Sequence, residues 1–150
     1  KNSILIVRGC GPVGYPGSAE VINMQPPDRL LKKGINTLPT LGDGRQSGTS
    51  ASPSILHVSP ESAVGGDLGI IKTGDQIKID LNKRRVDLLI PQSEFKIRRK
   101  KRKIFKFNNQ TPWQEIFRDT VGQLEDGACI NSRGKFLKVS STKGIPRDSH

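Results

Sequence analysis

The residues best suited to chemistry lie in one stretch rich in glycine and hydroxyl groups, Gly42-Asp43-Gly44-Arg45-Gln46-Ser47-Gly48-Thr49-Ser50. A serine can abstract a proton only if its pKa is pushed far down, which a nearby metal ion or other cation can do. Ser47 follows Arg45 by two positions, in a loop rich in backbone N–H donors, and Thr49 is near enough to reach a bound oxyanion. The pattern indicates either a proton-abstraction site or a Gly/Ser turn without chemistry.

A second glycine-rich loop occupies residues 9–17 (GCGPVGYPG) and precedes Glu20. A carboxylate beside such a loop is a candidate Mg²⁺ ligand, and the alternative is an acid that complements the dipole at a helix N-terminus. Asp43 is expected to cap or brace its own loop. His57, in the middle of an expected strand, is more typical of a packed residue than of a ligand. The two loops could jointly build an oxyanion and metal site.

The elements that must position these loops are short. Apolar runs predict strands at 3–8, 36–41 and 54–59, and Pro60 begins a single helical turn at 60–63. Three more short strands, at 68–71, 76–81 and 85–90, are spaced as in an antiparallel, barrel-like or sandwich-like unit. Helices are expected at 19–24, 28–33, 92–103 and 111–120, the last with a Thr cap followed by Pro. Weak strands are expected at 129–130 and 136–139. The fold class is therefore α+β.

Length and composition place the chain in a broad class. Its 150 residues amount to one domain, with 33% hydrophobic residues and many Gly and Pro. It begins at Lys1 and reaches a strand almost at once, so we expect a fragment or a processed product. It holds neither a signal-peptide pattern nor the roughly 18 apolar residues that a membrane span needs. Cys10 and Cys129 lack metal-ligand spacing, so a reducing cytoplasm is the default.

The net charge of +11 is concentrated in one run. Eight Lys and Arg residues lie between Lys96 and Lys106, with no acid among them. Such a run could bind nucleic acid or another anionic surface, or it could be the solvated end of a helix. We favour the helix end, because no nucleic-acid-binding fold signature accompanies the run.

Motifs along the whole chain resemble those of one enzyme family. VGYPGSAEVINMQPP, GDGRQSGTS, HVSPESAVGGDLGIIKTGDQIKIDL, QTPWQEI and the ending GIPRDSH occur in the order seen in the dihydroxy-acid, 6-phosphogluconate and sugar-acid dehydratases. The resemblance is to the C-terminal domain of that family and is strongest toward its sugar-acid members. It implies a β-barrel-like swivelling domain of short strands with flanking helices, similar to that of aconitase-like proteins, and places residues 1–150 in that domain.

The resemblance also implies roles for residues. Ser47 matches the base, an alkoxide that removes the C2 proton of the acid, and Thr49 matches a neighbouring active-site hydroxyl. Glu20 matches the one Mg²⁺ ligand that this domain supplies. Arg45 and His150 are the expected substrate-binding residues, His150 because the tail resembles that of one subgroup. The substrate is expected to be a sugar acid, an aldonate such as D-xylonate, dehydrated to a 2-keto-3-deoxy acid.

The resemblance assigns the remaining parts to an N-terminal domain that this chain lacks. That domain is expected to carry the cysteines of an iron–sulfur cluster and most Mg²⁺ ligands, so the isolated chain is expected to be inactive. A homo-oligomer is expected, with no membrane contact and no nucleic-acid partner. The alternatives are a dihydroxy-acid dehydratase of branched-chain amino-acid synthesis and a non-catalytic basic binding module. The basic run is heavier than is usual for the family.

Overall fold

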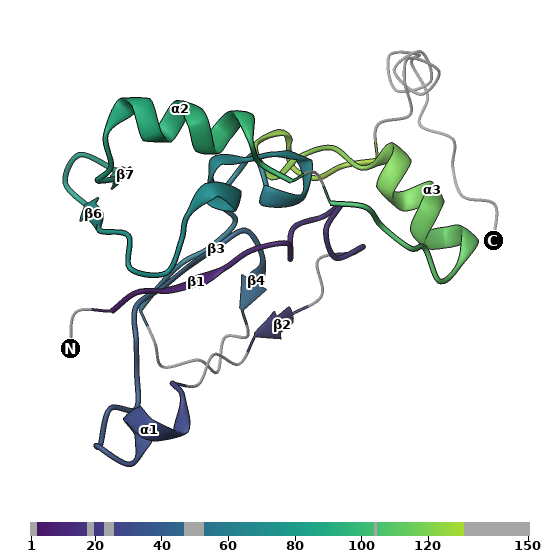
Figure 1. The fold of residues 1–150 in the computed structure, drawn as a ribbon. Helices are drawn as coiled ribbons and strands as arrows, with labels where there is room; N and C mark the ends of the chain where they lie inside the picture. Colours follow the sequence, from purple (N-terminus) through teal and green to yellow (C-terminus); the bar gives the residue numbers. More distant parts are fainter. Residues whose placement is uncertain (1–2, 18–19, 23–25, 47–52, 104, 131–150) are drawn as a thin grey trace.

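Short strands and helices are joined by long loops in the computed structural model, which describes residues 3–17, 20–22, 26–46, 53–103 and 105–130 (Figure 1). The strands are β1 (Leu5–Val7), β2 (Glu20–Ile22), β3 (Thr40–Gly42), β4 (Arg45–Gln46), β5 (Ser54–Ile55), β6 (Ile77–Asp80) and β7 (Arg85–Leu88). The α-helices are α1 (Asp28–Leu31), α2 (Gln92–Lys100) and α3 (Pro112–Thr120). Three 3₁₀ turns are η1 (Ser62–Val64), η2 (Asp67–Ile70) and η3 (Leu124–Asp126).

The α+β class is confirmed, but most of the strand pairing is parallel. One sheet has the order β1-β3-β5 with both pairings parallel, and β2 pairs in parallel with β4. Only β6 and β7 form an antiparallel hairpin among the named strands. The expected barrel does not close within the described residues, and the expected antiparallel unit of three strands is reduced to this hairpin.

Two local predictions were wrong. Residues 20–22 form a strand instead of part of a helix, because Val21 and Ile22 are β-branched and β4 offers a pairing edge. Residues 67–70 form η2 instead of a strand. Leu68 and Ile70 are both buried as strand alternation would require, but Gly69 between them weakens a strand and its N–H donates to the Gly66 carbonyl.

The apolar core is small, and its residues come from β3 and the residues just before it and from the 3₁₀ turns η1 and η2. Its buried hydrophobic side chains are Leu38, Leu41, Ala63, Leu68 and Ile70. Four polar side chains are buried with them: Thr40, Asp43, Glu61 and Ser62. A core that includes two fully buried carboxylates must supply hydrogen-bond donors to them, and this requirement shapes the site described below.

The helices flank this core as expected. In α2, Arg98 forms an ion pair with Asp75 at 2.5 Å, which ties the helix to the turn before β6. It forms a second ion pair with Glu94 of the same helix at 2.6 Å. In α3, the Thr111 hydroxyl accepts a hydrogen bond from the Gln114 N–H, so the predicted cap is confirmed. None of the helices in the described ranges is long and apolar enough to cross a membrane.

Candidate functional site

The loops that follow β1, β3 and β5 meet at one edge of the parallel sheet. Parallel register places the carboxyl ends of these strands together, which is the usual position of sites in such sheets. The backbone confirms the contact, since the N–H of Val58 donates to the Gly42 carbonyl at 3.0 Å and the N–H of Asp43 donates to the Val7 carbonyl at 3.3 Å. Residues far apart in the sequence therefore share this edge.

Asp43, which directly follows β3, binds the glycine-rich loop at residues 9–17. Its side chain is fully buried, and its oxygens accept hydrogen bonds from the N–H groups of Gly9 and Cys10, both at 3.0 Å. They also accept from the Ser62 N–H at 2.9 Å and from the Ser62 hydroxyl at 2.5 Å. Asp43 was expected to cap or brace its own loop, most of which lies outside the described residues; among the described residues it binds the loop at 9–17 and the start of η1.

Glu61 binds the same loop at residues 9–17, four residues further along the chain than Asp43 does. It is fully buried and accepts hydrogen bonds from the N–H groups of Val13 and Gly14, each at 2.8 Å. The Gln123 side chain donates to the same carboxylate at 2.9 Å, and its oxygen accepts the Glu61 N–H at 2.9 Å. Two carboxylates thus replace water as acceptors for four N–H groups of the loop.

Two glycines allow this close approach. A Cβ added to Gly11 would lie 2.5 Å from the Glu61 Oε2, and one added to Gly44 would lie 2.7 Å from the Cys10 Cβ. A side chain at Gly11 would displace the Glu61 carboxylate, and one at Gly44 would separate the segment after β3 from Cys10. These two glycines are therefore needed for the close packing of the loop at residues 9–17 against its neighbours.

The pairing of β2 with β4 brings two predicted site residues together. Glu20 and Arg45 are register partners in adjacent parallel strands, and β4 ends at Gln46, immediately before Ser47. The prediction that the two glycine loops contribute to one place is consistent with this register. Arg45 is exposed, and its substrate-binding role stays a prediction. Ser47, Thr49 and His150 lie outside the described residues, and their roles stay predictions.

His57 differs from its prediction. It is exposed, lies after the end of β5 and has a left-handed φ of 58°, so it is not a packed residue in the middle of a strand. The His57 N–H donates to the Gly44 carbonyl at 3.4 Å, so the chain after β5 lies beside the segment that follows β3. Cys10 is half-buried beside the same loop, and burial, followed by the Asp43 carboxylate, raises the pKa of its thiol.

Glu61, Ser62 and Gln123 were not among the predicted site residues. The signal that was available is local: an acid and a serine at the start of a predicted turn, directly after Pro60. Polar residues at such positions normally cap the turn, yet Glu61 makes no capping bond with its side chain. Their true partners are 19 to 62 residues away in the chain, so no spacing rule reveals them.

The described residues do not contain a complete metal site. No group of three or more His, Cys, Asp or Glu side chains among them could hold a metal ion. Each of the four carboxylate oxygens of Asp43 and Glu61 already accepts at least one hydrogen bond from an N–H or hydroxyl group. Within this part of the chain the donors therefore do not fit an iron–sulfur cluster or a complete Mg²⁺ site.

Comparison with known proteins identifies the family. The family model described as dihydroxy-acid/6-phosphogluconate dehydratase C-terminal matches residues 1–128. The whole chain is 52% identical to a D-xylonate dehydratase of Caulobacter vibrioides and 37% identical to an L-arabinonate dehydratase of Rhizobium leguminosarum, over 25% of each relative. It is 41% identical, over 87% of its length, to 24% of a dihydroxy-acid dehydratase of Thermodesulfovibrio yellowstonii. The chain spans about a quarter of the length of these relatives, and it belongs to the dihydroxy-acid/6-phosphogluconate dehydratase family as a match to its C-terminal part.

Proposed function

We propose that this chain is the C-terminal part of a hydro-lyase that dehydrates a sugar acid, an aldonate such as D-xylonate, to a 2-keto-3-deoxy acid. The observation that carries the proposal is the 52% identity with a D-xylonate dehydratase along all 150 residues. The relative named for dihydroxy-acid dehydration is less similar, at 41% over 131 residues. Dehydration of a branched-chain dihydroxy acid is therefore the second candidate.

Ser47 is the proposed base. Its alkoxide removes the proton from C2 of the acid as the C3–O bond breaks, and that proton and the departing C3 hydroxide together make one molecule of water. The resulting enol tautomerises to the 2-keto-3-deoxy product. Thr49 is proposed to hydrogen-bond the substrate beside it, and Arg45 and His150 to bind the substrate's oxygen atoms. An exposed guanidinium suits this role, because it can hold a carboxylate in a bidentate geometry.

The structure supports the proposal through the way the chain reaches Ser47. Asp43 binds the segment that leads into Ser47 to the loop that leads toward Glu20, and the β2–β4 register pairs Glu20 with Arg45. Glu20 is proposed as the one Mg²⁺ ligand of this chain. When bound, Mg²⁺ and an iron–sulfur cluster would supply positive charge for the substrate oxygens, with their other ligands in an N-terminal domain of the same protein.

The experiment is an anaerobic assay of the whole protein, loaded with its cluster and Mg²⁺, on D-xylonate, L-arabinonate and 2,3-dihydroxyisovalerate. We expect turnover of a sugar acid, and loss of that turnover in Ser47→Ala with substrate binding retained. Ser54→Ala, an exposed serine in β5, is the matched control and should keep the activity. Preference for 2,3-dihydroxyisovalerate would favour the second candidate, and turnover by Ser47→Ala would contradict the assignment of the base.

A further inference from the structure

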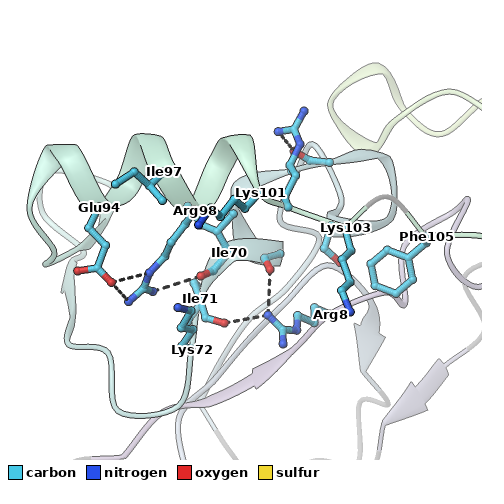
Figure 2. Close-up of a pocket in the computed structure, with 15 residues that line it drawn as sticks. Arg8, Ile70, Ile71, Lys72, Glu94, Ile97, Arg98, Lys101, Lys103 and Phe105 are labelled. Atoms are coloured by element: carbon cyan, nitrogen blue, oxygen red, sulfur yellow. Dashed lines mark hydrogen bonds and ion pairs between the residues drawn. The ribbon is translucent and has the colours of Figure 1, made fainter.

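A cavity of about 670 Å³ lies beneath α2 (Figure 2), and none of its lining residues belongs to β2 or β4. Its walls come from the end of β1, from the segment between η1 and β6, and from α2 with the residues that follow it. Six of its lining residues are lysine or arginine and only one, Glu94, is acidic. The basic run that the proposed function leaves unexplained therefore supplies much of the lining of a real cavity.

Two of the six cations are neutralised or used within the fold. Arg98 donates to Asp75 at 2.5 and 3.0 Å and to Glu94 at 2.6 and 2.9 Å, so its charge is balanced by two carboxylates. Arg102 donates to the Gly65 carbonyl at 2.5 Å and fixes the segment that follows α2. These two arginines stabilise the fold, because their guanidinium groups already bind partners within this chain.

Of the other four cations, Lys72 interacts electrostatically with the Asp75 carboxylate. The remaining three form no ion pair with any described residue. Among these three, Lys101 and Lys103 are exposed. Arg8 donates to the Gly69 and Ile71 carbonyls at 3.0 and 2.8 Å, which orients the guanidinium without neutralising it. In Figure 2 the Lys103 side chain extends toward the end of the cavity where Arg8 lies, beside Phe105.

The chemistry of this lining fits a phosphate group. A guanidinium that is already oriented, together with two ammonium groups, provides several charge-assisted donors for oxyanion oxygens. Ile70, Ile97 and Phe105 add an apolar surface for the organic part of a ligand. The volume is in the range of small-molecule pockets, and a concave site of this size suits a single phosphorylated metabolite better than the extended backbone of a nucleic acid.

We propose that this cavity is a binding site for the phosphate group of a small phosphorylated organic molecule, held by Arg8, Lys101 and Lys103. The site is separate from the proposed proton-abstraction site and does not depend on its chemistry. It gives the heavy basic run a role other than that of a solvated helix end.

The test is calorimetric titration of the whole protein with ribose 5-phosphate, with ribose as the uncharged control ligand. We expect the phosphate ester to bind and ribose not to bind. Lys101→Glu/Lys103→Glu should weaken binding by roughly a hundredfold, since two charge-assisted contacts are replaced by repulsion. The matched control is Lys96→Glu/Lys100→Glu, which makes the same charge change on exposed residues of α2 that do not line the cavity, and it should stay within about threefold.

Both double variants alter exposed side chains, and circular dichroism checks that they fold. The Lys101→Gln/Lys103→Gln variant, which adds no negative charge, should also weaken binding by about tenfold or more. The proposal is overturned if ribose 5-phosphate does not bind at millimolar concentration, or if both double variants weaken binding equally. It is also overturned if a 12-nucleotide single-stranded DNA binds more tightly and its affinity falls equally in both double variants, because the run would then act as a nucleic-acid surface.

Discussion

Replacement of Asp43 by Asn tests whether a buried carboxylate fixes the two glycine loops. Asp43→Asn keeps the shape of the side chain but removes its charge and turns one acceptor oxygen into a donor. In the native structure one oxygen accepts from the Cys10 N–H, and the other accepts from the Gly9 N–H, the Ser62 N–H and the Ser62 hydroxyl. The best amide orientation keeps the oxygen facing the three donors and turns the NH₂ toward Cys10.

The size of the effect follows from these contacts. The variant loses one hydrogen bond to a charged acceptor and leaves a buried N–H without a partner, at a combined cost of about 3 kcal/mol, and the three remaining bonds weaken. This cost falls on the contact between residues 9–14 and 43–44 instead of on the whole fold. A free energy of about 3 kcal/mol corresponds to roughly a hundredfold increase in the population of the locally open state.

Hydrogen exchange followed by mass spectrometry on the whole protein measures this opening. Peptides that cover residues 9–14 should exchange about a hundredfold faster in Asp43→Asn, while peptides from α2 and the β6–β7 hairpin should not change. Asp67→Asn is the matched control, because Asp67 is 47% exposed and its ion pair with Arg99 is at the surface. Exchange of residues 9–14 that stays within a few-fold of the native rate would refute the argument that Asp43 holds the loop.

Two further predictions concern a glycine and an ion pair. Gly66→Ala should lower the free energy of unfolding by about 3 kcal/mol or more, measured by urea titration, because the new Cβ would lie 1.7 Å from the Pro60 carbonyl oxygen. Gly69→Ala is the control: its Cβ would have no neighbour closer than 3.5 Å, so it should cost less than about 1 kcal/mol. The hydrogen bonds from Arg98 lower the pKa of Asp75. The Arg98–Asp75 ion pair, which joins α2 to the turn before β6, therefore stabilises the fold fully above the ordinary aspartate pKa of about 3.9. Its contribution is lost as the pH falls through the lower pKa that Asp75 has in the folded protein. The protection factors of the α2 amides, which correct for the intrinsic pH dependence of exchange, should fall in that acid range. Asp75→Asn should lower them at neutral pH and remove their acid dependence; unchanged protection in the variant would contradict the link.

Features with a local cause could be predicted from the sequence. The cap of α3 needs only Thr111, Pro112 and Gln114, and the turn before β6 needs only its Gly and Asp, so both were found. Short motifs along the whole chain led to the family, which the comparisons confirm. In each case the residues that decide the structure lie within a few positions of one another.

Features with a distant cause could not be predicted. Glu61 meets Val13 and Gln123 from separations of 48 and 62 residues, and no period or spacing records those contacts. The strands of the parallel sheet were expected from their apolar runs, but their parallel pairing was not predicted. Register partners such as Leu5 and Thr40 lie far apart in the sequence, so no local pattern records the pairing. The strand at Glu20–Ile22 likewise depends on β4 as a partner.

The two buried carboxylates also show how this C-terminal part of the family's proteins is held together. A buried carboxylate that accepts only N–H and hydroxyl donors is costly if any donor is lost, so it holds its partners in one arrangement. Asp43 and Glu61 find those donors within this chain, which means that the contact between the glycine loops does not need groups from the remainder of the protein. Ser47 would then enter the active site from a segment whose start is already fixed. If so, Asp43→Asn in the whole enzyme should lower kcat more than it raises KM, because it would displace the base without removing a substrate contact.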